Sequence, residues 1–401
     1  MSAPPMSLVF VTPRYGDEVV GGAESGARSL ATRLAADGYR VKVHTTCALS
    51  PVTWEDAYPE GRVEIDGVVV HRHRVDRPRR RDFDAVSARL LAAPRAVTRD
   101  EALAWIDDQG PTSRALLEAV GAVDEGICAF YPYLYHPTVR GLAAVRVPAV
   151  LHPAAHPEPP LDLPVFDEVF AGADGLALHS RAEQDLVAGR FAATRAHPQS
   201  VVGLPVDGPP RPPDAEPFDE PTALYLGRVD RGKGTDDLVA RFAAWRRRGG
   251  RGRLVLAGPV VHRPPRTRGV EVRGRVDDDE RWELLARADV LVNPSPHESF
   301  SLVVPEAWTV GTPVLVNARC APLFEHVHRG GGGLWYRGWA DFDAALGLFL
   351  GRDPRARRLG EAGRRYVAAE FSWPAVRTRY LGLLERAAAH HAIRGPRHSR
   401  R

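Results

Sequence analysis

Lysine and cysteine are scarce in this sequence. Only two of the 54 basic residues are lysines, Lys42 and Lys233, and the other 52 are arginines. This skew indicates a coding bias toward arginine, so each remaining lysine merits closer inspection. The three cysteines, Cys47, Cys128 and Cys320, are odd in number and widely separated. This pattern excludes a disulfide framework and a zinc-binding spacing, and it favours reduced thiols in a cytoplasmic protein.

Long apolar runs are missing as well. No stretch approaches the 18 or more apolar residues of a membrane span. The N-terminal run LVFV lacks a basic flank and is too short for a signal peptide, so we interpret it as a first strand. The net charge of +4 excludes a chain that binds polyanions over its whole surface. With 401 residues and 44% hydrophobic content, the composition is that of a globular protein with two domains.

The first half of the chain alternates strand and helix patterns. Strands are expected at six apolar or β-branched runs, residues 8–13, 41–47, 67–75, 127–133, 148–153 and 175–180. Helices are expected at residues 25–39 and 181–191, where apolar residues recur at helical spacing. Strands that alternate with helices predict a parallel sheet with right-handed crossovers.

A segment rich in proline and acidic residues, 203–221, interrupts this alternation and has the composition of a linker. Strand patterns resume at residues 222–229, 253–258, 270–276, 289–295 and 312–317, with helix patterns at 235–248, 278–288 and 302–311. The sequence therefore predicts an α/β protein with two Rossmann-like doubly wound domains, residues 1–203 and 204–385. Ligands of such sheets bind at the carboxyl ends of the strands, so a central cleft between the two domains is the expected site.

Basic residues gather at the C-terminal end and in the run RHRVDRPRRRDF, residues 72–83. We interpret residues 391–401 as a basic, disordered tail and the run as a solvated loop. The alternative is a nucleic-acid-binding protein, in which removal of the tail would abolish binding. The sequence gives no indication of contact with a membrane surface.

A glycine-containing loop follows the first expected strand. Its sequence YGDEVVGGAES places Gly21 and Gly22 just before a helix, where the backbone can approach a ligand and N–H groups suit phosphate. Glu24 falls in the first helical turn, which the helix dipole favours. A plain turn with a capped helix explains the same residues, and the glycine pair alone does not decide between the two.

A second loop, LGRVDRGKGTDDL, carries the cations Arg228 and Lys233. Arginine offers a planar fork of donors and lysine a point charge, so the pair suits a diphosphate. A solvated loop is the alternative. The scarcity of lysine favours the functional interpretation, because this position keeps an ammonium group in a chain that otherwise uses arginine.

A third segment, HESFSLVVPE, contains two carboxylates, Glu298 and Glu306, in apolar surroundings. We expect Ser301 to cap the helix that follows, so that the backbone N–H groups of Phe300, Ser301 and Leu302 bind an anion at its start. Carboxylates beside an anion site suit the hydroxyl groups of the molecule that carries the phosphate. The alternative is that Glu306 merely caps a helix or pairs with an arginine.

Two histidines, His152 and His156, follow a strand of the first half, and Glu158 lies close behind them. We expect one of these histidines to reach the ligand, and the sequence leaves open which one. Their spacing would also suit a metal ion. No helix and no third ligand lie nearby, so no metal site is predicted.

Taken together, these motifs resemble the retaining glycosyltransferases of family 4, which have the GT-B fold. The resemblance rests on GGAE near the N-terminus, a histidine after a strand, GR-x4-K and E-x7-E, in this order along nearly the whole chain. Residues 288–317 look like the signature segment of that family, and FSWPAVRTRYLGLLERA looks like its C-terminal helix. In GT-B proteins this helix, here about residues 370–390, crosses back onto the first domain.

The resemblance implies a hexosyltransferase that moves a sugar from a nucleotide diphosphate donor to an acceptor hydroxyl with retention of configuration. It assigns acceptor binding to the first domain and donor binding to the second, and it implies no bound cofactor and no metal. The leaving phosphate would itself take the proton of the acceptor. The implied catalytic residues are His156, Arg228, Lys233 and Glu298.

The implied donor contacts cover the whole nucleotide sugar. They are Arg228 and Lys233 at the diphosphate, Glu298 at the sugar, Glu306 at the ribose, Phe300, Ser301 and Leu302 at the sugar phosphate, Arg275 and Val276 near the base, and Gly21 and Gly22 at the diphosphate from the first domain. His156 would lie at the reacting face of the sugar.

Some positions depart from the family pattern. Ser299 and Ser301 stand where small residues or glycine are common, and Pro157 stands where the histidine motif often has aspartate. The last departure keeps His152 open as the active-site histidine. An epimerase or phosphorylase of the same fold and a non-catalytic sugar-nucleotide-binding protein are the alternative functions. Product analysis with a labelled donor separates the enzymes, and the four charged residues argue against the binding protein.

Overall fold

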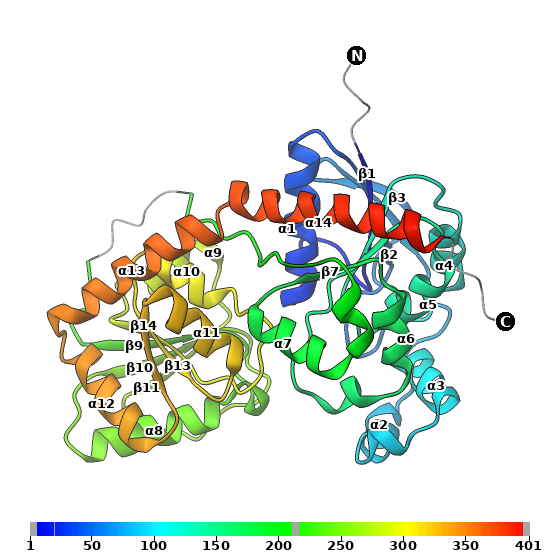
Figure 1. Ribbon diagram of the computed structural model, residues 1–401. Helices are drawn as coiled ribbons and strands as arrows, with labels where there is room; N and C mark the ends of the chain where they lie inside the picture. The colour runs from blue at the N-terminus through cyan, green and yellow to red at the C-terminus, as the bar shows by residue number, and fades with distance from the viewer. Residues whose placement is uncertain (1–5, 20, 211–215, 396–401) are drawn as a thin grey trace. The chain divides into compact units, whose positions relative to one another are not determined.

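The computed structural model describes residues 6–19, 21–210 and 216–395. The chain divides into two compact units, one from Met1–Leu204 and Arg377–Arg401 and the other from Pro205–Val376. The prediction of two Rossmann-like sheets is confirmed, because the first unit holds a sheet of eight strands and the second a sheet of six (Figure 1). Residues 211–215 of the expected linker and 396–401 of the expected tail lie outside the described residues.

The sheet of the first unit has the strand order β3-β4-β2-β1-β5-β6-β7-β8. Its strands are β1 (Ser7–Val11), β2 (Arg40–Thr46), β3 (Gly61–Ile65), β4 (Val68–His73), β5 (Ile127–Phe130), β6 (Ala149–Leu151), β7 (Gly175–Leu178) and β8 (Gln199–Val201). All pairs are parallel except β3 with β4. The six predicted strands are present, and the two missed ones, β3 and β8, contain no fully buried residue.

Helices connect and cover these strands. They are α1 (Gly22–Ala36), α2 (Phe83–Leu90), α3 (Arg99–Gln109), α4 (Arg114–Gly121), α5 (His136–Ala144), α6 (Val165–Gly172) and α7 (Arg181–Arg190), with 3-10 turns η1 (Pro94–Ala96), η2 (Pro159–Asp162) and η3 (Ala192–Ala196). Apolar residues of α3 to α7 and of β1, β5, β6 and β7 form one buried core. The expected helices at 25–39 and 181–191 correspond to α1 and α7.

The second unit has a fully parallel sheet with the order β11-β10-β9-β12-β13-β14. Its strands are β9 (Thr222–Leu226), β10 (Arg253–Ala257), β11 (Val270–Gly274), β12 (Val290–Asn293), β13 (Val314–Asn317) and β14 (Gly333–Tyr336). Its helices are η4 (Arg231–Lys233), α8 (Thr235–Arg247), α9 (Asp278–Arg287), α10 (Val303–Thr309), α11 (Ala321–Gly330), α12 (Trp339–Leu350) and α13 (Pro354–Glu370). Helices α8 and α12 lie on one side of the sheet, and α10 and α13 on the other (Figure 1).

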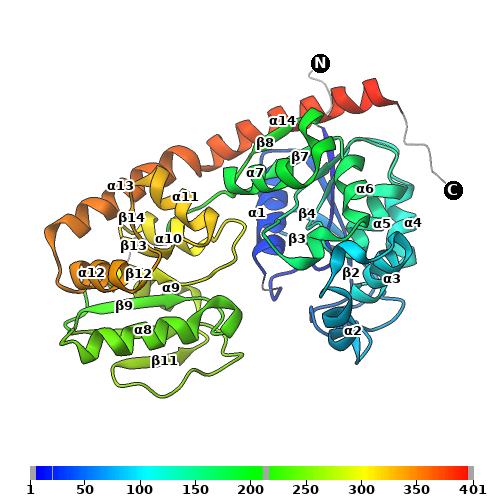
Figure 2. The same ribbon diagram turned by 60° about the horizontal axis from the view of Figure 1, so that its bottom comes forward.

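The last helix, α14 (Trp373–Arg394), belongs to the first unit from Arg377 onward. It runs beside β7 and β8 (Figure 2), and a side chain at Gly175 would place its Cβ only 3.0 Å from that of Ala387. The prediction of a disordered tail from residue 391 is wrong at its start, because this helix continues to Arg394. There His391 Nδ1 lies 3.0 Å from a carboxylate oxygen of Asp174.

Two further observations concern the helices and the cysteines. Across the residues that the structure describes, none of the helices combines the length and the apolar character that a membrane crossing requires. Cys47, Cys128 and Cys320 are each buried.

Candidate active site

The loop after β9 carries both predicted cations of the second unit. Tyr225 Oη donates to the backbone carbonyl of Arg228 at 2.7 Å, which fixes the start of the loop. The Arg228 side chain is 56% exposed and lies 3.3 Å from the Asp230 carboxylate. Gly234 follows Lys233 with φ 76°, and a Cβ there would lie 2.7 Å from the carbonyl of Pro294. Glycine is therefore required where this loop packs against the segment after β12.

Lys233 and Glu298 come together from two separate motifs. Their Nζ and Oε1 atoms are 2.8 Å apart, although 65 positions separate the residues in the chain. The side chains are 32% and 16% exposed, so solvent screens the pair only partly. One ammonium and one carboxylate thus stand side by side at the carboxyl ends of β9 and β12, where ligands of doubly wound sheets bind.

The segment that carries Glu298 is braced by neighbouring strands and helices. Asn293 at the end of β12 donates to Ser301 Oγ at 2.9 Å. Asn317 at the end of β13 donates to the carbonyl of Pro294 at 3.0 Å. His326 Nε2 of α11 donates to the carbonyl of Phe300 at 2.8 Å. Burial lowers the pKa of His326 to about 4, so its ring is neutral at pH 7 and one tautomer serves as the donor. These three bracing residues were not predicted.

The predicted cap of α10 is wrong. The helix begins at Val303, its N-cap is Leu302, and no side chain caps it. Ser301 instead has φ 70°, in the left-handed region that glycine favours. Glycine would adopt this conformation without strain, and the hydrogen bond from Asn293 helps to hold the serine in it. Whether the N–H groups at Phe300, Ser301 and Leu302 bind an anion remains a prediction.

Glu306 pairs with an arginine that the sequence did not point to. Its Oε1 atom accepts from Arg281 Nη1 at 2.8 Å, and the two side chains are 16% and 24% exposed. Arg281 lies on α9, with its guanidinium over the ring of Trp282. No local pattern marks this contact, since it joins residues 25 positions apart. It matches the alternative in which Glu306 pairs with an arginine, although a partly exposed carboxylate can still accept from a ligand.

The residues expected near the base lie together after β11. Arg275 and Val276 form the short loop between this strand and α9, at the carboxyl edge of the sheet. Asp277 then caps α9 by accepting from the N–H of Glu280 at 2.8 Å. The acidic run 277–279 thus opens α9, which corresponds to the helix expected at residues 278–288.

In the first unit, the glycine loop lies next to a buried ion pair. Gly21 is the N-cap of α1, and Gly22 is its first residue. Glu24 stands in the first turn, as predicted, but it also pairs with Arg14, and both side chains are less than 10% exposed. A Cβ at Gly21 would lie 2.2 Å from the Glu24 carboxylate, so the pair requires glycine at this position. No sequence pattern pointed to Arg14.

The two histidines lie in different environments. His152 is 1% exposed, stacks on Tyr131 and hydrogen-bonds the hydroxyl of Tyr380 at 3.1 Å. His156 is partly exposed, and its Nε2 lies 3.6 Å from the carboxylate of Glu158. His152 is therefore enclosed, whereas His156 can meet a ligand. No group of three or more histidine, cysteine or acidic side chains in the described ranges is arranged to hold a metal ion.

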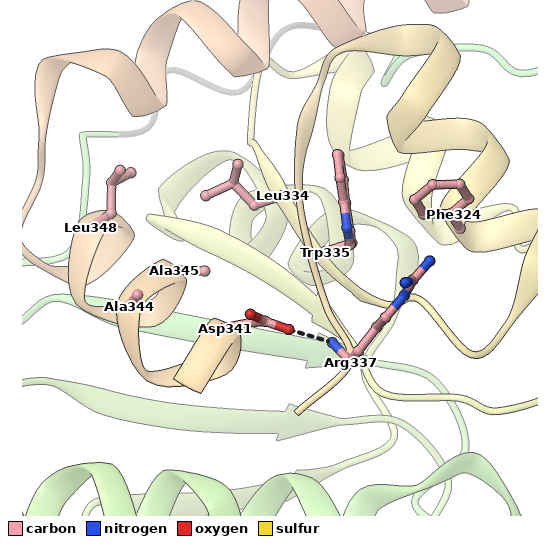
Figure 3. A pocket seen from close by; sticks show the side chains of 8 residues that line it. All are labelled: Phe324, Leu334, Trp335, Arg337, Asp341, Ala344, Ala345 and Leu348. Carbon is pink, nitrogen blue, oxygen red and sulfur yellow. Dashed lines mark hydrogen bonds between the residues drawn. The ribbon is translucent and has the colours of Figure 1, made fainter. Parts of the chain in front are cut away.

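Two surface hollows lie apart from the paired charges. One of about 750 Å³ in the first unit is bordered by Glu158 and by residues of η1, η2 and α7. Another of about 610 Å³ opens beside β14 in the second unit (Figure 3). Its lining consists of Phe324, Leu334, Trp335, Arg337, Asp341, Ala344, Ala345 and Leu348. Neither lining contains a predicted site residue.

Comparison with known proteins finds similarity to a family in the second unit. Residues 220–346 match the family described as Glycosyl transferases group 1. The D-inositol 3-phosphate glycosyltransferase of Xylanimonas cellulosilytica is 33% identical over 268 residues, which cover 59% of this chain and 62% of that protein. The glycogen synthase of Mycobacterium tuberculosis is 34% identical over 166 residues, 39% of this chain and 40% of that protein. The match thus spans less than two thirds of the length of either relative.

Solved structures share the fold of this chain. Sucrose-phosphate synthase from Thermosynechococcus elongatus superimposes with a TM-score of 0.68 at 21% identity, over 96% of this chain and 100% of that one. Anabaena HepE in complex with UDP-glucose gives a TM-score of 0.65 at 14% identity, over 96% and 100%. These likenesses confirm the predicted GT-B fold.

Proposed function

We propose that this protein is a retaining hexosyltransferase that moves a sugar from a nucleotide diphosphate donor to an acceptor hydroxyl. The observation that carries this assignment is the 2.8 Å contact between Lys233 Nζ and Glu298 Oε1 at the strand ends of the second unit. An ammonium suits the diphosphate, and the adjacent carboxylate suits the hydroxyl groups of the sugar attached to it. The match of residues 220–346 to the group 1 glycosyltransferases supports the same reaction class.

The proposed reaction exchanges one bond of the anomeric carbon for another. The bond to the diphosphate oxygen breaks, the bond to the acceptor oxygen forms on the same face, and the acceptor proton passes to the leaving phosphate. Arg228 and Lys233 stabilise the charge that develops on the diphosphate. Glu298 holds the sugar, and His156 lies at its reacting face. The enclosure of His152 supports the choice of His156.

Further residues complete the proposed donor site. Glu306 would accept from the ribose and exchange part of its contact with Arg281. Arg275 and Val276 lie near the base, and the backbone at Phe300, Ser301 and Leu302 faces the sugar phosphate. Gly21 and Gly22 would approach the diphosphate, and the open space beside Gly22, where a Cβ meets nothing within 4 Å, would leave room for a ligand.

The choice of donor to test first follows from the structural relatives. Anabaena HepE was solved with UDP-glucose, and the trehalose-6-phosphate structure from Escherichia coli holds UDP-2-fluoro glucose. A UDP-hexose is therefore the first candidate for this chain. We also propose a cytoplasmic location, which the scarcity of cysteine supports, since the chain has only three and each is buried.

A screen of donors, followed by a comparison of two lysine variants, tests the proposed function. Thermal shift with a panel of nucleotide sugars identifies the donor, since a specific ligand raises apparent stability. Transfer is then measured with labelled donor for wild type, Lys233→Met and Lys42→Met. We expect about 100-fold lower turnover for the first variant, the loss typical of one removed transition-state donor. The second variant, which removes an exposed lysine of β2, should keep full turnover.

The products decide between the enzyme classes. A labelled glycoside with retained configuration supports the transferase. A labelled nucleotide sugar with inverted hydroxyl configuration identifies an epimerase, and a sugar phosphate identifies a phosphorylase. Near-normal turnover of Lys233→Met would contradict the proposal that Lys233 binds the diphosphate.

A further inference from the structure

A buried carboxyl group of the first unit has no part in the scheme above. Glu183 is the third residue of α7, and its side chain is 0% exposed. Glutamate at this position commonly reaches back to the N-cap from the protein surface. Part of this pattern is present, because the Glu183 N–H donates to Ser180 Oγ at 3.0 Å and Glu183 Oε2 accepts from the N–H of His179 at 2.6 Å.

The other carboxylate oxygen serves a different loop. Glu183 Oε1 accepts from the N–H of Ala155 at 2.7 Å, across 28 positions of the chain. Ala155 directly precedes His156, in the segment that follows β6. The bond therefore fixes the backbone of that segment one residue before the partly exposed histidine.

The segment needs such a support. Ala154 has φ 54°, a left-handed conformation that costs about 1 kcal/mol or more for a residue with a Cβ. Conformations of this kind persist only where surrounding contacts impose them. The Glu183 bond acts on the very next residue and holds the segment in this conformation.

The carboxyl group is kept here at a cost in stability. Burial raises the pKa of Glu183 to about 8. The two hydrogen bonds from backbone N–H groups act in the opposite direction, because they favour the charged form. A helix cap alone needs no such burial, as Glu101 shows in α3. There the glutamate at the same helix position closes a capping box with Thr98 at the surface.

We propose that Glu183 is a positioning residue for His156, acting through its hydrogen bond to the Ala155 N–H. This assignment rests on the proposed function, because the role of His156 does. Positioning through the backbone predicts an effect on turnover rather than on donor affinity, since the proposed donor residues are almost all in the second unit.

The first test is a double-mutant cycle. Glu183→Gln keeps the shape but places an amide where two N–H donors converge, so the bond to Ala155 weakens. We expect kcat to fall about tenfold or more, as small misplacements of a reacting group do, with little change in the KM for donor. In a His156→Ala background the same change should cause no further loss. Glu101→Gln, the matched variant of α3, should leave both constants unchanged.

An equal loss in the His156→Ala background would overturn the positioning role and leave Glu183 as a general stabilising residue. So would an unchanged kcat for Glu183→Gln in a folded enzyme.

Two readouts do not need transfer activity. Hydrogen exchange of the peptide that covers residues 153–157 should be faster in Glu183→Gln than in wild type and in Glu101→Gln. The NMR chemical shifts of the His156 ring should change in the first variant only, because the ring moves relative to Glu158. If wild type shows no transfer, the proposed function fails while these readouts still decide the contact. Unchanged exchange and unchanged chemical shifts would overturn the positioning role.

Discussion

At the scale of single residues, the lysine and the glutamate proposed to bind the donor are each other's partner in the free protein. Lys233 and Glu298 are partly buried and 2.8 Å apart, so each reduces the cost of keeping the other away from water. In the proposed site, a diphosphate sugar would replace this contact on both sides at once. A bare nucleoside diphosphate would satisfy only the lysine and would leave the carboxylate without its cation.

This difference leads to a prediction for Glu298→Gln. The variant should bind the sugar donor more weakly, by about 1–3 kcal/mol for a lost charged hydrogen bond. It should bind the bare diphosphate as well as wild type or better, because Lys233 is freed. Calorimetric titration with both ligands checks this, and Glu283→Gln, a surface change on α9, is the control. Equal weakening of both ligands would contradict the assignment of Glu298 to the sugar.

Ser301 offers a second prediction at this scale. Ser301→Ala loses the bond from Asn293 and keeps the left-handed backbone, so we expect about 1–2 kcal/mol lower stability. Ser301→Gly loses the same bond but relieves the backbone, and should be about 1 kcal/mol more stable than the alanine variant. Urea denaturation of the two variants checks the order. The reverse order would show that the backbone at this position is unstrained.

At the scale of elements, one close approach joins two functional loops. Gly234→Ala would place a Cβ 2.7 Å from the Pro294 carbonyl at φ 76°. We expect this change to destabilise the protein by about 1–3 kcal/mol and to weaken donor binding, because Lys233 moves away from Glu298. Gly189→Ala in α7, where a Cβ meets nothing within 4 Å, should instead stabilise by up to about 1 kcal/mol. Denaturation and donor titration of both variants provide the measurement.

Elements also show what the sequence could and could not predict. Buried parallel strands are nearly continuous apolar runs, so eleven runs identified eleven strands of the two sheets. Three strands were not identified: β3 and β8 are exposed or half-buried and carry no such run, and β14 is a short, only partly buried strand. The order of GR-x4-K and E-x7-E pointed to Lys233 and Glu298. The contacts of Arg281, Asn317 and Glu183 could not be predicted, because each joins distant segments that only the folded sheet brings together.

At the scale of the whole molecule, buried histidines set the response to acid. Burial lowers the pKa values of His44 to about 3 and of His136, His179, His197 and His326 to about 4, from a usual value near 6.5. Below pH 6.5 the unfolded chain therefore binds more protons than the folded one at these sites. Their combined effect is a stability that falls as the pH drops from 6.5 toward 4.

Glu183 acts in the opposite direction. Its raised pKa favours folding at low pH, and this contribution disappears as the pH rises from about 4.5 to 8. The five histidines lower stability toward acid by more than the one glutamate raises it. We therefore expect the urea concentration at the midpoint of unfolding to be lower at pH 5.0 than at pH 6.5. In Glu183→Gln the fall toward acid should be steeper, because the opposing group is absent. Equal midpoints at the two pH values would contradict this balance.

The scarcity of lysine gives the folded chain an unusual chemical simplicity. An amine-reactive acylating reagent has two side-chain targets, Lys42, exposed on β2, and Lys233, held against Glu298. Occupation of the proposed donor site should shield the second amine and leave the first as an internal reference. The ratio of the two acylated peptides in a mass spectrum then reports donor occupancy without an assay of transfer. If this ratio does not change at a saturating concentration of donor, the nucleotide sugar binds elsewhere.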